Sequence, residues 1–160
     1  MAKIYIETSI VSYLTARPSN NLIAAAWQRE TVDWWETQRG RFDLYISEVV
    51  VEEAGRGDES AASRRLRALE DIEVLQLDKK SVALSKALIE RGAVPRKALD
   101  DALHLAVAAV NGMEFLLTWN CRHIDNAELK PKIRYVIESE GYQCPEIATP
   151  IELMGVHDDD

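Results

Sequence analysis

Short apolar runs alternate with longer segments of mixed polarity along the chain. The run at 3–7 is apolar and β-branched, which is typical of a buried strand. Similar runs predict strands at 42–46, 73–77 and 114–117, and a short edge strand that ends at Ile147. Ser19 or Asn20 can cap a long helix that reaches Gln38. The same start and stop signals predict helices at 8–14, 47–54, 58–68, 81–91, 96–111 and 126–139, and a turn at 150–154.

This alternation of strands and helices determines the expected fold class. Consecutive strand–helix–strand units connect in the right-handed sense and build a parallel sheet with helices on both faces. The chain is therefore expected to be an α/β protein. No internal repeat or long linker interrupts residues 1–155, which we expect to form a single domain, and the acidic end, 156–160, is expected to be a frayed tail.

The composition narrows the class of protein. A length of 160 residues with 47% hydrophobic content fits one globular domain. No stretch approaches the roughly 18 apolar residues of a membrane-spanning helix. The first residues, MAKIYIETS, lack the features of a secretory signal, so a cytoplasmic protein without a membrane partner is expected. Cys121 and Cys144 are then expected to be reduced thiols.

Several ligand classes lack their motif. No Gly-x-Gly-x-x-Gly or Walker-type segment follows a strand, which argues against a nucleotide cofactor, and Cys121-Arg122-His123 does not have zinc-ligand spacing. The net charge of −8 argues against binding nucleic acid by general electrostatics, although a metal-dependent nuclease needs only a local carboxylate cluster. Basic side chains still form two groups that are either solvated helix faces or nucleic-acid contacts: Arg64, Arg65 and Arg67, and Arg96 with Lys97.

Three acidic residues lie where strands end or helices begin. Glu7 closes the first predicted strand, Glu53 lies shortly after the second, and Asp101 is in the first turn of an apolar helix. Because the carboxyl ends of parallel strands meet at one edge of the sheet, these carboxylates can meet there. A carboxylate that ends a buried strand is costly unless it is paired or bound to a metal. Simpler roles stay open, since Glu7 and Asp101 can cap helices and Glu53 can face solvent.

Polar neighbours extend this candidate site. Asn120 directly follows the fourth strand and can bond a metal-bound water or a carboxylate, and Thr118 can orient a carboxylate, although both residue types are common in turns and caps. His104 lies three residues after Asp101 and can share its helix face, but a lone His in an apolar helix is more often a satisfied core group. His123 can contact a phosphate or be structural.

The residue types indicate which metal would bind. Mg²⁺ and Mn²⁺ prefer oxygen ligands and retain several waters. Acids from separate segments, without a cysteine or a second nearby histidine, suit these ions better than zinc. In phosphodiester hydrolysis such an ion activates water and neutralises charge on the phosphate, so the chemistry needs carboxylates more than a nucleophilic side chain.

Three sequence blocks together resemble the PIN-domain family, and most closely the VapC-like toxins of bacterial type II toxin–antitoxin systems. The blocks are IYIETSIVSYL at 4–14, ISEVVVEEAGRGD at 46–58 and ALDDALHLAVAAVNGMEFLLTWNCRHIDNA at 98–127. The likeness extends from Lys3 to about Leu153, and the first and third blocks are its most specific parts. It implies a three-layer α/β/α domain with a central parallel sheet of four to five strands.

The resemblance also implies the roles of individual residues. Glu7 matches the acid that ends the first strand, which is more often Asp in the family. Glu53 matches a Ser-x5-Glu element that begins at Ser47, and Asp101 matches an Asp-Ala-Leu element and leaves Asp100 as a supporting acid. These three acids are the implied ligands of Mg²⁺ or Mn²⁺. The family's Thr-x-Asp is Thr118-Trp119-Asn120 here, so a neutral amide replaces the fourth acid and is expected to weaken a second metal site.

The function implied by the resemblance is a metal-dependent endoribonuclease that acts on RNA. A cognate antitoxin protein and a homodimer are implied as partners. Two alternatives stay open: a degenerate PIN domain that binds RNA or a protein without cleaving, which Glu7 and Asn120 favour, and an unrelated α/β phosphohydrolase that uses the same acids on a small phosphoester.

Overall fold

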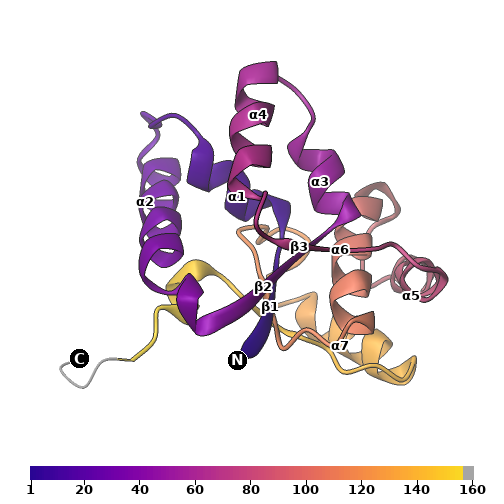
Figure 1. The fold of residues 1–160 in the computed structure, drawn as a ribbon. Coiled ribbons are helices and arrows are strands. Elements are labelled where there is room, and N and C mark those ends of the chain that lie inside the picture. The colour runs from indigo at the N-terminus through magenta and orange to yellow at the C-terminus, as the bar shows by residue number, and fades with distance from the viewer. Residues whose placement is uncertain (157–160) are drawn as a thin grey trace.

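The computed structural model describes residues 1–156 and consists of parallel strands joined by helices (Figure 1). The strands are β1 (Ala2–Ile6), β2 (Phe42–Ser47), β3 (Glu73–Leu75), β4 (Phe115–Leu117) and β5 (Glu146–Ala148). The helices are α1 (Thr8–Thr15), α2 (Leu22–Thr37), α3 (Glu48–Ala54), α4 (Glu59–Ala68), α5 (Lys79–Glu90), α6 (Leu99–Val110) and α7 (Lys130–Ser139). Short 3₁₀ segments occupy Arg39–Arg41, Arg96–Ala98 and Pro150–Leu153. The acidic tail predicted at 156–160 lies outside the described residues apart from Val156.

The five strands form one sheet in the order β3-β2-β1-β4-β5, and every neighbouring pair is parallel. The first strand is therefore central, and its Ile4, Tyr5 and Ile6 are fully buried. Helices cover both faces, with α1 and α2 on the left of the sheet and α5, α6 and α7 on the right (Figure 1). The α/β/α layers and the parallel sheet expected from the sequence are confirmed. None of the helices within 1–156 is long and apolar enough to cross a membrane.

The apolar helix α6 packs deeply into this core. Leu105, Ala106, Val107 and Ala108 are fully buried on it, so the helix cannot rotate without exposing apolar surface. Its first turn is thereby held against the carboxyl edge of the sheet. This explains why Asp101 points along that edge and not freely into water: its side chain is only 18% exposed.

Four helix starts differ by two or more residues from the sequence prediction, those of α2, α5, α6 and α7, and the first and last have a clear local cause. Helix α2 begins at Leu22, because the side chain of Asn21, not that of Ser19 or Asn20, accepts a hydrogen bond from the Ala24 amide at 3.0 Å. Helix α7 begins at Lys130 and not at Asn126, although the Asn126 side chain accepts from the amides of Glu128 and Leu129 as a cap does. Pro131 has no N–H to donate to the Ala127 carbonyl, so the run of helical bonds is interrupted there and resumes with the bond from Ile133 to Leu129.

Candidate active site

The candidate site is built at the carboxyl ends of β1, β2 and β4. Glu7 follows the last residue of β1, Thr118 follows the last residue of β4, and Glu53 lies on α3, which begins directly after β2. Ser47 caps α3 by accepting from the Val49 amide at 3.2 Å, which fixes the direction in which this helix leaves the sheet. The topology thus brings three separate segments of sequence to one edge.

Glu7 is a buried carboxylate that is held from two sides. It caps α1, accepting hydrogen bonds from the Ser9 amide at 3.0 Å and the Ser9 hydroxyl at 2.5 Å. It also accepts from the Thr118 hydroxyl at 2.5 Å, as the orienting role for Thr118 predicts. The capping alternative is therefore correct, but it leaves a carboxylate only 5% exposed with no Lys or Arg within 4.0 Å among residues 1–156. A cap alone does not need that burial.

Glu53 is the inward-facing member of its acidic pair. Its Oε1 accepts from the Thr8 hydroxyl at 2.7 Å and contacts His104 Nε2 at 2.5 Å. The neighbouring Glu52 points outward and pairs with Arg56 at 2.8 Å. The choice of Glu53 over Glu52 as the candidate therefore agrees with where the two side chains lie.

His104 is the residue that the sequence prediction did not assign to the site. It is fully buried, as expected of a core histidine, but its Nε2 also lies 3.9 Å from Glu7, so it faces both carboxylates. Its Nδ1 bonds to the Tyr5 hydroxyl at 2.7 Å, and that hydroxyl bonds to Ser47 at 2.7 Å. Because an ionised carboxylate only accepts, the proton on Nε2 points to Glu53. The signal in the sequence was the three-residue spacing from Asp101.

The electrostatics of this group favour an ion pair. Burial by itself lowers the pKa of His104, but the hydrogen bond to Glu53 and the charges of Glu7, Glu53 and Asp101 together raise it above its ordinary value. Burial likewise acts to raise the pKa of Glu53, yet the hydrogen bond and the charge of His104, with smaller help from Thr8 and Arg56, lower it. Both shifts point to an imidazolium between the two carboxylates.

Asp101 lies in a second group beside the first. Its Oδ1 accepts from the side-chain amide of Asn120 at 3.0 Å, and its Oδ2 lies 2.9 Å from His123 Nδ1. The Asn120 side-chain oxygen accepts from the amides of Arg122 and His123, so it closes the turn after β4. Asp100 points elsewhere and pairs with Arg56 at 3.4 Å.

Hydrogen bonds connect the two groups. The backbone amide of Asn120 donates to the Thr118 hydroxyl at 2.8 Å, and that hydroxyl donates to Glu7. Four of the predicted site residues thus belong to one hydrogen-bonded network: Glu7, Thr118, Asn120 and Asp101. Glu53 adjoins it through His104, whose Nε2 bonds to Glu53 and lies 3.9 Å from Glu7. His104 and His123, whose roles the sequence prediction left open, also bond to these residues.

The donor atoms at this edge can hold a divalent metal. The atoms that lie within 4.8 Å of one another come from Glu7, Glu53 and His104, and Asp101 is not among them. The oxygen-only set of Glu7, Glu53 and Asp101 stays a prediction, and His104 could join it as a ligand only after its Nε2 loses the proton that points to Glu53. Two carboxylates around one histidine, in a buried place without Lys or Arg, still fit a cation well.

Comparison with known proteins identifies the family. A model of the PIN domain matches residues 4–128, so the chain belongs to the PIN-domain family, as the sequence blocks indicate. No curated protein sequence matches this chain significantly.

Solved structures share the fold at low sequence identity. A chain of VapBC2 from Rickettsia felis, bound to a DNA fragment from their promoter, is 13% identical with a TM-score of 0.57, and the match covers 92% of this chain and 98% of that one. VapC20 of Mycobacterium tuberculosis, a sarcin–ricin loop cleaving toxin, is 14% identical with a TM-score of 0.59 over 87% and 95%. VapBC-1 of nontypeable Haemophilus influenzae is 14% identical with a TM-score of 0.55 over 93% and 98%. The VapC-like fold is thereby confirmed.

Proposed function

We propose that this protein is a Mg²⁺- or Mn²⁺-dependent endoribonuclease and the toxin of a type II toxin–antitoxin pair. The observation that carries the proposal is the buried Glu7 carboxylate, which faces Glu53 across His104 at the carboxyl edge of a PIN-domain sheet. Glu7 and Glu53 share one imidazolium, so one negative charge is left without a Lys or Arg partner within 1–156, and a metal cation would compensate it. The likeness to VapC20, a sarcin–ricin loop cleaving toxin, supports a nucleic-acid substrate.

In such a site some residues would hold the ion and others would orient its ligands. Glu7 and Glu53 would hold the ion, with Asp101 reaching it directly or through water. A divalent ion bound there would supply an activated water and would neutralise negative charge on the phosphate. Ser9 and Thr118 fix the Glu7 carboxylate, Thr8 and His104 fix Glu53, and Asn120 and His123 fix Asp101. Supporting contacts of this kind keep ligands in the geometry that a metal needs.

The proposed partners follow from the neighbours with this fold. Two of them are VapBC complexes, and on that basis we propose a cognate antitoxin for this chain. From the family resemblance of the sequence we also propose a homodimer and a cytoplasmic location. Expression beside the neighbouring open reading frames, followed by purification of the tagged chain, tests the antitoxin: it should elute as a defined complex of two proteins.

A second candidate function is RNA binding without cleavage. The observation that favours it is the pair of contacts that hold Asp101. One carboxylate oxygen bonds to the Asn120 side chain and the other to His123, and Asn120 is a neutral amide at the position where a fourth acid would add negative charge. In this alternative the edge of the sheet is a closed hydrogen-bonded network and the domain acts as a platform.

Cleavage of labelled RNA by the purified protein separates these functions. We expect endonucleolytic products in Mn²⁺ or Mg²⁺, no products in EDTA, and recovery when the ion is restored, because without the ion nothing neutralises the charge that develops on the phosphate beside the carboxylates. RNA that is retained but uncut in every metal would contradict the ribonuclease and support the platform. Hydrolysis of a small phosphodiester with intact RNA would support the phosphohydrolase instead.

A further inference from the structure

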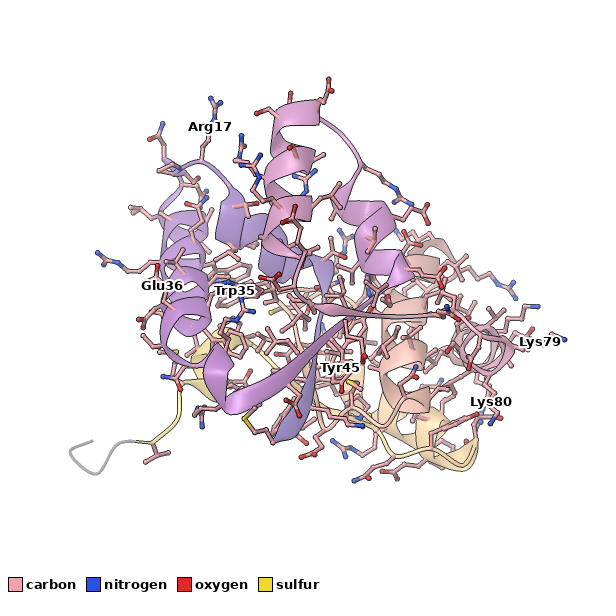
Figure 2. All side chains as sticks on the ribbon, viewed as in Figure 1. Arg17, Trp35, Glu36, Tyr45, Lys79 and Lys80 are labelled. Carbon is pink, nitrogen blue, oxygen red and sulfur yellow. The ribbon has the colours of Figure 1, made fainter. Side chains whose placement is uncertain are left out.

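A pocket of about 520 Å³ lies between the end of α1 and the start of α4. Arginine and hydroxyl side chains line much of it: Ser12, Thr15, Arg17, Ser60, Arg64 and Arg65. Figure 2 shows Arg17 pointing outward from the segment between α1 and α2, at the end of the molecule where α4 lies. We call this feature the arginine pocket.

The arginines of this pocket have no carboxylate partner. Within 1–156 no Asp or Glu oxygen lies within 4.0 Å of the guanidinium nitrogens of Arg17, Arg64 or Arg65. Arg64 donates instead to the Thr15 carbonyl at 3.3 Å and to the Ser60 hydroxyl at 3.0 Å. Arg65 donates to backbone carbonyls at 2.9 and 2.6 Å. These bonds hold the guanidinium groups of Arg64 and Arg65 in place without neutralising their charge, and the exposed Arg17 adds a third positive charge.

Most arginines among residues 1–156 likewise lack a carboxylate partner, and what sets this pocket apart is that three of them line one cavity. The acid that lines the pocket, Asp58, is occupied as the cap of α4, where it accepts from the Ala61 amide at 2.9 Å. The pocket is therefore a fixed local concentration of positive charge.

One face of α1 connects the arginine pocket to the candidate active site. Thr8, which donates to Glu53, begins this helix, and Ser12 and Thr15 follow it at intervals of four and three residues on the same side. At about 1.5 Å per residue, Ser12 lies roughly 6 Å and Thr15 roughly 10 Å along the axis from Thr8. A strand that places one phosphate at the carboxylates can therefore pass along α1 to the pocket.

We propose that the arginine pocket binds a backbone phosphate of a single-stranded RNA whose adjacent phosphodiester lies at the Glu7–Glu53 edge. The proposal rests on the proposed function. Planar guanidinium groups with nearby hydroxyl donors match phosphate oxygens, and Arg is suited to bidentate contact with them. The contact positions the strand and reads no base, since phosphate contacts carry no direct sequence information.

Salt-dependent RNA binding tests the pocket. The probe is a fluorescein-labelled single-stranded RNA, titrated in the Asp101→Asn background so that it stays intact. Removing the charges of Arg17 and Arg64 together, as Arg17→Gln/Arg64→Gln, should lower the slope of log K against log salt by about 0.7, because the pocket contacts one phosphate and each single-strand phosphate contact contributes about 0.7. The same relation gives an affinity loss of about 5-fold in 0.1 M salt. The loss should be equal for unrelated sequences.

Two variants control for charge and for folding. Arg29→Gln/Arg67→Gln removes two positive charges from side chains that do not line the pocket, and it should leave the slope unchanged. Arg64→Lys keeps the positive charge but loses the hydrogen bond from the guanidinium to the Thr15 carbonyl, and it should retain the wild-type slope.

The outcomes distinguish the pocket from the proposed function. A smaller slope in the double variant supports the pocket whether or not the wild type cleaves RNA. An unchanged slope in that variant refutes phosphate binding by the arginine pocket even if the wild type cleaves RNA. The arginines would then be available to bind an acidic protein segment. No RNA binding by any variant overturns both proposals.

Discussion

Asp101→Asn is expected to lower RNA cleavage about a thousandfold while the protein stays folded. Loss of a metal-directed carboxylate removes several kcal/mol of charge stabilisation, and every 1.36 kcal/mol is a factor of ten in rate. The amide also changes the partners of Asn120 and His123, whose contacts with Asp101 are 3.0 and 2.9 Å. Single-turnover cleavage of labelled RNA measures the rate, and circular dichroism checks the fold.

Asp100→Asn is the matched control for this prediction. It removes the same charge one position earlier in the same helix turn, but its carboxylate pairs with exposed Arg56 at 3.4 Å and faces away from the network. Its cleavage rate should stay within about threefold of the wild type, since exposed ion pairs contribute little. Equal activity of Asp101→Asn and the wild type would refute the role of Asp101.

His104→Leu is expected to destabilise the protein by about 3 kcal/mol, because removal of one partner from a buried ion pair leaves the other uncompensated. His104 is fully buried against Glu53 at 2.5 Å and Tyr5 at 2.7 Å. For a domain of this size such a loss corresponds to a melting temperature lower by about 6–12 °C. Urea and thermal unfolding measure both quantities.

The control for His104→Leu is the same substitution at His123. That ring is 19% exposed and bonds to the partly exposed Asp101, so the loss should stay near about 1 kcal/mol. Adding Glu53→Gln to His104→Leu should recover part of the stability, because the uncompensated charge is then removed. Comparable losses at His104 and His123, or no coupling with Glu53, would show that the buried ion pair does not exist.

The sequence predicts the order and type of the elements well, because the information is local. Apolar runs mark β1, β2 and β4, and Ser47 and Asn126 show both the strength and the limit of that information. Ser47 caps α3 as predicted, since a cap needs only the next few amides. Asn126 makes the bonds of a helix cap, but the helix begins only at Lys130, because Pro131 cannot donate the backbone hydrogen bond that would continue the turn from Asn126.

The candidate site could be predicted only in part. Glu7 and Glu53 follow from their places after strands, since parallel topology brings strand ends together. His104 does not, because its helix pattern is apolar on every side, and only the packing of α6 decides that the ring faces two acids. The clamp of Asn120 and His123 on Asp101 depends on the path of the turn after β4, which no periodicity describes.

Calorimetric titration of Mn²⁺ into the metal-free protein tests the central claim most directly. We predict saturable binding in the wild type and in Asp100→Asn, and its loss in Glu7→Gln, whose carboxylate is the buried member of the closest donor cluster. The Glu7→Gln variant keeps acceptor and donor atoms for the cap of α1, and its melting temperature confirms that it is folded. An isotherm for folded Glu7→Gln identical to that of the wild type would contradict a metal site at this edge of the sheet.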